Sequence, residues 1–284
     1  MDVYEAVTSR RAVRGFTDQP VPRDVLERVL SAAAWSPSGS NIQPWNIYVV
    51  TGARLAELKK RAVERVATGV PWDEREYEMY PPAMKSPYAE RRSAFGKERY
   101  SALGIAREDW EARQRAAIAN WDCFGAPAAL FCYIDRDLGP AQWADAGMYL
   151  QRVMLLRAEG LHSPQMAWSQ VRETVAEVLS PPDGLILFCG MSIGYEDVTV
   201  GYTRTGRAPL AETVTFIDDF DQASASAARQ AAPNSPGFAP ISSSVTVRSA
   251  ARGAAATHSK PTSTGCTGSS VAEATPIGTA RPSS

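Results

Sequence analysis

The stretch SPSGSNIQPWNIYVV, residues 36–50, decides where this chain changes from helix to sheet. Ser, Pro, Gly and Asn favour turns, so residues 36–44 predict a polar loop. The β-branched and aromatic run from residue 45 to residue 50 predicts a strand. A helix must therefore end before this loop, and a sheet must begin after it.

Amphipathic helices are predicted on both sides of the loop and strand. Pro22 is a favourable first-turn residue, and apolar side chains follow it at helical spacing over residues 25–33. Residues 54–66 repeat apolar side chains at the same spacing, which predicts a helix after the strand. A further short helix begins near the N-terminus, where Asp2 can cap it.

The middle of the chain alternates charged segments with apolar ones. Residues 67–115 are charged and rich in Tyr and Pro, so we expect one or two helices that form a lid or a pocket wall. Residues 142–159 are apolar nearly all round, which is typical of a helix in a core or a subunit interface. The other expected elements are strands at 128–134, 185–193 and 213–217 and a helix at 168–179. Together these elements predict an α+β fold.

The composition changes abruptly after residue 220. Ala, Ser, Thr, Gly and Pro make up 46 of the 64 residues from 221 to 284, and the only aromatic residue there is Phe238. Such a segment buries too little apolar surface to offset the entropy lost on ordering. We therefore expect a folded domain over residues 1–220 and a disordered tail over residues 221–284.

Composition and charge exclude several classes of protein. The chain has 284 residues, a formal net charge of -1 and 44% hydrophobic residues, which favours a globular protein over a nucleic-acid binder with a basic surface. No apolar run is long enough to span a bilayer, and the N-terminus lacks the apolar core of a signal peptide. The four cysteines show no close pairing, which fits a reducing compartment. We therefore expect a cytoplasmic protein without nucleic-acid or membrane partners.

Histidine is scarce, which limits the chemistry that side chains can perform. The chain contains two histidines, His162 and His258, and no hydrolase, zinc-site or phosphate-loop motif. We therefore expect no metal site. If the chain is an enzyme, a bound cofactor carries out the reaction.

Arginines at both ends of the predicted domain are candidates for holding such a cofactor. Arg10 and Arg14 are one helical turn apart and can point at one anion, with Arg11 between them. Cations at the end of a helix are also favoured by its dipole, so for the triplet alone a solvated cluster is the better explanation. Arg204 and Arg207 would add positive charge to the same site if the chain returns to its N-terminal segment.

The loop at residues 36–44 is a further candidate. Gly39 allows a ligand to approach the backbone closely, and Asn41 and Gln43 carry paired donors and acceptors. A capped connector between a helix and a strand would have the same composition. From composition alone, the two interpretations are equally good.

The order of these motifs resembles the nitroreductase family of FMN-dependent enzymes, in its bacterial branch that acts on nitroaromatic compounds such as nitrobenzoates. The segments that carry the resemblance are RRAVRGF, SPSGSNIQPW, GAPAALF, GLHSPQMAW and RTGRAPLAETVTF, and they extend over residues 2–219. The resemblance implies a central, mostly antiparallel sheet flanked by helices. It also implies an intertwined homodimer with two FMN sites between the subunits.

The resemblance assigns roles to the candidate residues. Contacts to FMN are implied for Arg10, Arg11, Arg14, Pro164, Gln165, Arg204 and Arg207. The partner subunit would contribute Pro37, Ser38, Gly39 and Asn41, with Gln43 beside them. Candidate walls of the substrate pocket are Tyr80, Tyr88, Trp121 and Phe124, although for each of these four core or interface packing is the better explanation.

The implied reaction is a ping-pong exchange with NADH or NADPH as co-substrate. The nicotinamide gives a hydride to flavin N5 and leaves, and a nitroaromatic or quinone-like acceptor then takes its place and is reduced. A nitro group would be reduced to the nitroso and hydroxylamine levels, and no catalytic side chain is required. Related activities remain open, namely flavin or quinone reduction and reductive dehalogenation, and a non-catalytic FMN-binding module is the alternative of another class.

Overall fold

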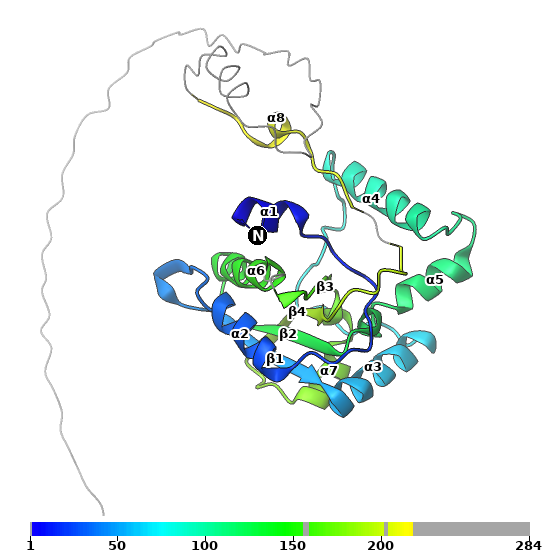
Figure 1. Ribbon diagram of the computed structural model, residues 1–284, viewed down its shortest axis with the longest axis horizontal. Helices are drawn as coiled ribbons and strands as arrows, with labels where there is room; N and C mark the ends of the chain where they lie inside the picture. The colour runs from blue at the N-terminus through cyan, green and yellow to red at the C-terminus, as the bar shows by residue number, and fades with distance from the viewer. Residues whose placement is uncertain (1, 156–158, 202–203, 218–284) are drawn as a thin grey trace, which may run out of the picture. The chain divides into compact units, whose positions relative to one another are not determined.

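The computed structural model describes residues 2–155, 159–201 and 204–217, and an antiparallel sheet forms its centre (Figure 1). The strands are β1 (Trp45–Thr51), β2 (Ala128–Asp135), β3 (Gln165–Met166) and β4 (Leu185–Ile193), in the spatial order β1-β2-β4-β3. The three longer strands confirm the predictions at 45–50, 128–134 and 185–193. β3 is only two residues long, which is too short to give a sequence pattern.

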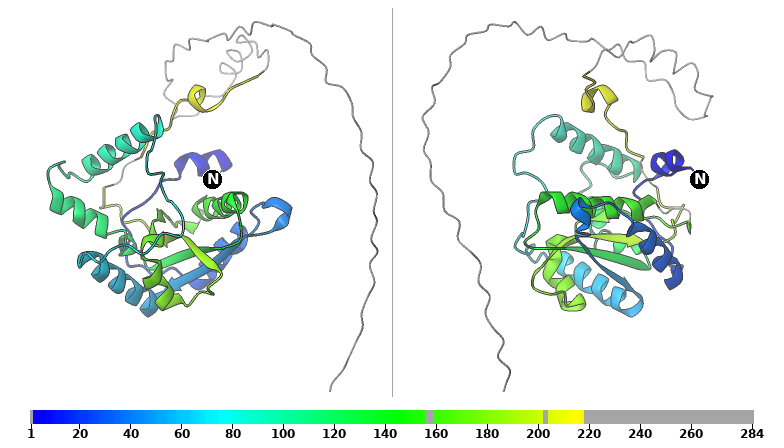
Figure 2. Two further views of the ribbon diagram at one scale, coloured as in Figure 1. Left: turned by 180° about the vertical axis from the view of Figure 1, so that it is seen from behind. Right: turned by 90° about the vertical axis from the view of Figure 1, so that its left-hand side faces the viewer.

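Different pairs of helices cover the two faces of the sheet. α2 (Arg23–Ala33) and α6 (Pro140–Leu155) pack on one face, whereas α3 (Gly52–Ala67) and α7 (Arg172–Leu179) pack on the other. Figure 2 shows α6 and α3 on opposite sides of the strands. The predicted α+β fold, with helices flanking an antiparallel sheet, is confirmed.

β2 lies between two hydrophobic cores, so both of its faces are apolar. Successive side chains of a strand point to opposite faces. Phe131 and Tyr133 therefore join the core beneath α3 and α7. Leu130, Cys132 and Ile134 join the core beneath α2 and α6. This central position explains why β2 is a continuous apolar run in the sequence rather than an alternating one.

The charged excursion after α3 contains two helices, α4 (Tyr88–Ala102) and α5 (Trp110–Ile118), as predicted. Neither helix has a buried residue. Two contacts that join them are the bond from Arg99 Nη2 on α4 to the Ala116 carbonyl on α5 at 3.2 Å and the Arg113 guanidinium of α5, which lies 4.1 Å from the centre of the Tyr100 ring on α4. The excursion is therefore an addition beside the two cores rather than one of the layers that form them.

The remaining elements are short. They are α1 (Val3–Ser9), α8 (Leu210–Thr213) and the 3-10 turns η1 (Gly39–Asn41), η2 (Cys123–Gly125) and η4 (Trp168–Val171). The predicted cap of α1 is confirmed, because Asp2 Oδ1 accepts the Glu5 N–H at 2.7 Å.

Two predicted elements need correction. The helix expected over 168–179 is broken between η4 and α7, because Val171 adopts φ −128° and ψ 37°, outside the helical region. The strand expected over 213–217 is wrong. The Val214 N–H donates to the Leu210 carbonyl at 2.8 Å and closes the turn of α8. An apolar alternation becomes a strand only beside another strand that takes up its hydrogen bonds.

The chain divides into two units, Met1–Val214 and Thr215–Ser284. The domain over residues 1–220 stays a prediction, and the tail expected over 221–284 lies outside the described residues. Within the described ranges, no helix combines the length and the apolar character that crossing a membrane requires.

Candidate functional site

The arginine-rich segment after α1 is extended, not helical. The helix ends at Ser9, and Arg10 adopts φ −61° and ψ 133°. Further along, the Phe16 N–H donates to the Phe124 carbonyl at 3.1 Å. Because this pairing holds the segment as extended chain, the expected helical turn between Arg10 and Arg14 is wrong.

Arg10 instead meets an arginine from the far end of the domain. Burial, and then the charge of Arg207, lower the pKa of Arg10. The Arg204 guanidinium donates to the Thr8 carbonyl close to the same place in the chain. The chain therefore does return to its N-terminal segment. Two like charges held together are unfavourable without an anion between them, so this pair is suited to a phosphate.

Arg11 takes part in an internal ion pair. Its guanidinium binds the carboxylate of Glu196, and the two side chains are 17% and 12% exposed. His162 Nε2 lies 3.8 Å from the same carboxylate. Glu196 thus joins the N-terminal segment to the segment that precedes β3. Only the guanidinium donors that Glu196 leaves over would be available to a ligand.

Arg14 is a half-buried cation beside a second arginine. Burial, and then the charge of Arg99, lower the pKa of Arg14 to about 10, so the side chain remains protonated at neutral pH. Its guanidinium lies 5.6 Å from the centre of the Phe95 ring. No carboxylate in the described ranges forms an ion pair with Arg14. Since a partly desolvated cation without a counter-ion is unfavourable, this position is suited to an anionic ligand.

A cavity of about 990 Å³ is lined in part by Arg14. Of the residues predicted for the site, its walls also include Tyr80, Trp121, Phe124 and Gln165. Trp121 and Phe124 are at most 9% exposed, so they serve both the core and the cavity wall. Tyr88 is 62% exposed and does not line this cavity, so its predicted role finds no support within one chain. The volume lies at the upper end of the range for small-molecule sites.

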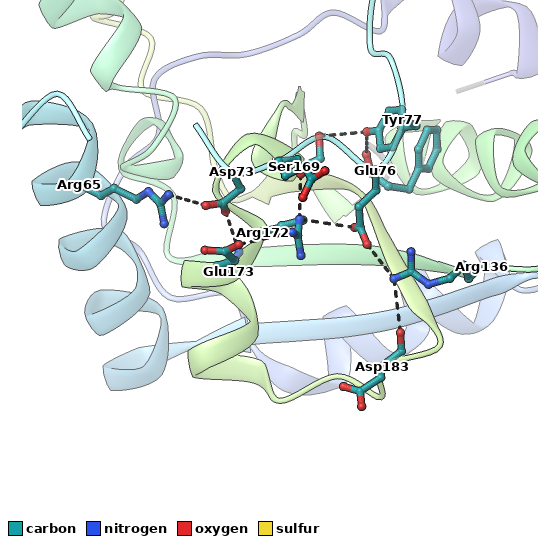
Figure 3. Close-up of polar contacts among 11 residues, drawn as sticks. Arg65, Asp73, Glu76, Tyr77, Arg136, Ser169, Arg172, Glu173 and Asp183 are labelled. Carbon is teal, nitrogen blue, oxygen red and sulfur yellow. Dashed lines mark hydrogen bonds and ion pairs between the residues drawn. The ribbon is translucent and has the colours of Figure 1, made fainter. Parts of the chain in front are cut away.

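Asp73 fastens one end of the cavity wall that residues 72–80 form. Its side chain is fully buried and pairs with Arg65 of α3. The other carboxylate oxygen accepts the Glu173 N–H at 2.8 Å (Figure 3). Glu173 lies in the first turn of α7, so Asp73 caps that helix from a distant part of the chain.

Tyr77 fastens the other end of this wall to the sheet. Its hydroxyl lies 3.1 Å from Ser169 Oγ and donates to the Phe188 carbonyl of β4 (Figure 3). Burial raises the pKa of Tyr77 to about 12, so the hydroxyl keeps its proton and remains a donor. The Glu76 carboxylate meets Arg136 at 2.7 Å just after β2. These contacts confirm that the excursion forms a pocket wall.

The loop at residues 36–44 is held by α6 and by its own backbone. The Gly39 N–H donates to Oδ2 of the buried Asp145 at 3.1 Å. Ser38 Oγ accepts the Gln43 N–H at 3.0 Å. Asn41 and Gln43 have φ of 57° and 53°, in the left-handed region that Asn tolerates and Gln seldom adopts. The loop therefore has a defined shape and is more than a simple connector.

The cavity walls do not include residues 37–43. One chain brings Arg10 to Arg207 and places Arg14 and Gln165 on one cavity, but it leaves the loop residues Pro37, Ser38, Gly39, Asn41 and Gln43 elsewhere. This separation is what a site shared by two copies of the chain would require.

Pro164 and Gln165 lie at an edge of the sheet. Gln165 begins β3 and pairs with Met191 of β4, and its side chain lines the cavity. Pro164 precedes it and is buried. The hydroxyl of Ser163 is buried without a hydrogen-bond partner among the described residues. A buried, unsatisfied hydroxyl is unfavourable, so it marks this edge as a place where a ligand atom would be stabilised.

The cysteines of the domain are unsuited to nucleophilic chemistry. Cys123, Cys132 and Cys189 are buried and free. Burial raises the pKa of Cys123 and of Cys189 to about 12, so neither forms a thiolate at neutral pH. Their role is to fill the core.

Sequence patterns missed several residues that build the site. Arg99, Asp73 and Glu196 gave no signal, because each acts through a contact with a distant part of the chain. Asp145, in contrast, does have a recognisable sequence signal. It is a carboxylate in a helix that is otherwise apolar nearly all round, and such a residue needs a buried partner.

Comparison with known proteins places these observations in one group of enzymes. The family described as Nitroreductase family matches residues 7–195. The 4-nitrobenzoate reductase of Nocardioides sp. strain LMS-CY is 35% identical over 228 residues, which are 78% of this chain and 92% of that protein. The chloronitrobenzene nitroreductase of Comamonas testosteroni is 34% identical over 221 residues, 76% of this chain and 97% of that protein.

A solved structure gives the same answer. The FMN- and NADPH-dependent nitroreductase NfnB from Sphigopyxis sp. strain HMH superimposes with a TM-score of 0.73 and is 38% identical. The match covers 77% of this chain and all of that one.

Proposed function

The chain belongs to the nitroreductase family, and we propose that it is an FMN-dependent oxidoreductase that uses NADH or NADPH to reduce nitroaromatic compounds. One observation carries the proposal beyond family membership. Arg14 is a half-buried cation without a carboxylate partner in the described ranges, and it lines a cavity large enough for a flat, anionic cofactor and an acceptor.

The residues present fit FMN. The paired charges of Arg10 and Arg207 suit a phosphate, and the cation of Arg14 suits a ring that gains negative charge on reduction. The full set proposed to contact FMN within one chain is Arg10, Arg11, Arg14, Pro164, Gln165, Arg204 and Arg207. FMN when bound supplies the redox chemistry, because it accepts two electrons from the nicotinamide and passes them to the acceptor.

The protein itself binds and orients the reactants and excludes water from the cavity. Trp121 and Phe124 give the cavity an apolar wall, and Tyr77 and Asp73 keep the opposite wall in place. Reduction of a nitro group to nitroso consumes one NAD(P)H and one proton and releases water. A second NAD(P)H and a second proton then give the hydroxylamine. His162 lies next to Glu196 and is not needed as a proton donor in this scheme.

The working unit is proposed to be a homodimer. The residues Pro37, Ser38, Gly39, Asn41 and Gln43 would reach the FMN site of the partner, which explains why they lie off the cavity of their own chain. Trp35, which directly precedes this loop, and Met148 on α6 are exposed apolar side chains. Both would be covered in such a dimer. The proposed location is the cytoplasm, which fits three buried, free thiols.

An anaerobic titration tests the redox proposal. Adding NADPH or NADH to the yellow holoenzyme should bleach the flavin, and adding nitrobenzene should restore the colour and yield nitroso and hydroxylamine products. If the flavin stays oxidised, the reductase proposal is wrong and the protein is a non-catalytic FMN-binding module. A panel of nitrobenzoates, quinones, free flavins and halogenated phenols, compared by kcat/KM, then separates nitroreduction from quinone or flavin reduction and from dehalogenation.

Two variants test the proposed site. Arg207→Ala should lose FMN during purification while the fold is retained, because a phosphate partner is removed from the surface of the domain. Arg23→Ala is the matched control, since its side chain is 91% exposed on α2. Light scattering of the holoenzyme tests the dimer, and a stable monomer with full FMN content would contradict it.

A further inference from the structure

Arg99 is a second arginine on the cavity, and its hydrogen bonds are incomplete. It lies in the last turn of α4 and lines the cavity together with Arg14. Of its donors, Nη2 reaches the Ala116 carbonyl at 3.2 Å. Nε is buried and has no hydrogen-bond partner in the described part of the chain. One N–H of this guanidinium is bonded to a carbonyl and another is buried without a hydrogen-bond partner. The guanidinium therefore has donors left that can bind an anion.

The charge of the cavity wall is positive. Its charged residues are Arg14, Arg99 and Glu78. The carboxylate of Glu78 is already paired, because it lies 3.0 Å from Arg75 Nη1. The two arginines have no such partner in the described ranges. A cavity with two unpaired cations and one neutralised carboxylate favours a ligand that carries negative charge.

The walls between these charges are aromatic. Trp72 and Trp121 lie with their ring centres 5.4 Å apart, and both line the cavity with Phe124. Aromatic walls favour a flat ring, and Arg99 lines the same cavity with a guanidinium whose fork of donors matches a carboxylate. The combination favours an aromatic ring that carries a carboxylate.

We propose that Arg99 binds the carboxylate of a nitroaromatic acid and makes this enzyme selective for anionic acceptors over neutral ones. This inference rests on the proposed nitroreductase function and names its substrate class. Arg14 remains with the cofactor, and Arg10 and Arg207 remain with the phosphate. Arg99 comes from α4, in the excursion between residues 67 and 115, so it is a specificity residue and not part of the cofactor set.

The size of the effect follows from the type of contact. A charge-assisted, two-pronged hydrogen bond between guanidinium and carboxylate corresponds to a change of about 10- to 100-fold in a binding constant. Arg99→Gln should therefore lower kcat/KM for 4-nitrobenzoate by about that factor, mainly through KM. The same variant should lower kcat/KM for nitrobenzene far less than kcat/KM for 4-nitrobenzoate, because nitrobenzene has no carboxylate. Arg99→Lys should restore part of the loss, since it keeps the charge but not the fork.

The matched control is Arg115→Gln on α5. It removes the same charge from a neighbouring helix, at a side chain that is 69% exposed and does not line the cavity. It should leave the preference for 4-nitrobenzoate over nitrobenzene unchanged. A parallel loss in both variants would mean that general electrostatic attraction, and not Arg99, sets the preference, and would overturn the proposal.

Binding of benzoate, measured by calorimetry on the holoenzyme, tests Arg99 without turnover. Benzoate should bind the wild type more tightly than benzamide does, and Arg99→Gln should abolish that difference. If benzoate and benzamide bind equally to the wild type, the proposal is wrong. If Arg99→Gln loses FMN or raises KM for NADPH instead, Arg99 serves the cofactor or co-substrate, and the proposal is equally wrong.

These readouts keep the two hypotheses apart. If NADPH fails to reduce the flavin, the proposed function fails, whereas the benzoate measurement still decides the role of Arg99. A different result is that NADPH reduces the flavin, but the ratio of kcat/KM for 4-nitrobenzoate to kcat/KM for nitrobenzene is the same in the wild type and in Arg99→Gln. The nitroreductase function then stands, and the proposed selectivity through Arg99 is refuted.

Discussion

The carboxylate of Asp145 on α6 accepts the backbone N–H of Gly39 at 3.1 Å. This bond ties the polar loop to a helix that the sequence presents as apolar nearly all round. Asp145 is 7% exposed, so its carboxylate depends on this contact for stabilisation in the core. The loop and the helix are therefore one structural unit, although about one hundred residues separate them along the chain.

Replacing Asp145 should weaken FMN binding through the loop. Asp145→Ala removes the acceptor of the Gly39 N–H, and we expect a loss of about 1–3 kcal/mol in stability and a lower FMN content. Asp145→Asn keeps an acceptor oxygen and should retain most of the FMN. Thermal unfolding and the ratio of flavin to protein absorbance measure both effects. Asp24→Ala, at an exposed position on α2, is the control and should change neither.

Breaking the pair between Glu196 and Arg11 should destabilise the whole domain. Both side chains are largely buried, so Glu196→Gln removes the negative charge that faces the Arg11 cation, and we expect a loss of about 3–5 kcal/mol in urea unfolding. Glu27→Gln breaks an exposed pair with Arg23 and should have little effect. Similar midpoints for the two variants would show that Glu196 is not an anchor.

Arg14→Met should move stability and cofactor binding in opposite directions. Burial lowers the pKa of Arg14 to about 10, which means that the fold disfavours its charged form. This unfavourable contribution is fully present below pH 10 and disappears as the pH rises above it. Without FMN, the variant should therefore be more stable than the wild type at pH 7, by about 0.5–2 kcal/mol. Its FMN affinity should fall, and a variant that is less stable without FMN would contradict this account.

Tyr77→Phe should loosen the cavity wall without unfolding the protein. The variant loses the hydrogen bonds to Ser169 and to the Phe188 carbonyl, which corresponds to about 0.5–1.5 kcal/mol. Because the wall shapes the acceptor site, KM for the nitroarene should rise more than kcat falls. Tyr4→Phe, at a side chain 83% exposed on α1, is the control. Unchanged kinetics in Tyr77→Phe would mean that packing alone holds the wall.

Truncation after residue 220 should leave a working enzyme, as we propose that residues 1–220 form the catalytic domain. The family match ends at residue 195, and the solved relative is covered in full by 77% of this chain. The truncated protein should keep its FMN and its kcat/KM for nitrobenzene within about twofold of the full chain. Loss of FMN on truncation would assign a role in the site to residues 221–284.

Much of the fold could be predicted from local patterns. β1, β2 and β4 and the helices α2, α3 and α6 each bury an apolar stripe or run, and such patterns are visible within the 7 to 16 consecutive residues of each element. The errors fall where a local pattern depends on a partner. Residues 213–217 alternate like a strand, but the Val214 N–H bonds to the Leu210 carbonyl and closes the turn of α8 instead. Residues 10–14 were expected to continue a helix, but they are followed by a bond from the Phe16 N–H to the distant Phe124 carbonyl.

The sequence by itself determined the class of fold, the family and the arginines from both ends of the domain, because these depend on residue type and order. Only the tertiary structure decided which charged side chain lies beside each arginine. Arg11 has Glu196, whereas Arg14 has a second cation in Arg99. An arginine either forms an ion pair within the protein or remains able to bind a ligand. Which of the two applies depends on the charged side chains that the fold brings within a few ångströms of its guanidinium. That proximity is a property of packing, and no spacing along the chain encodes it.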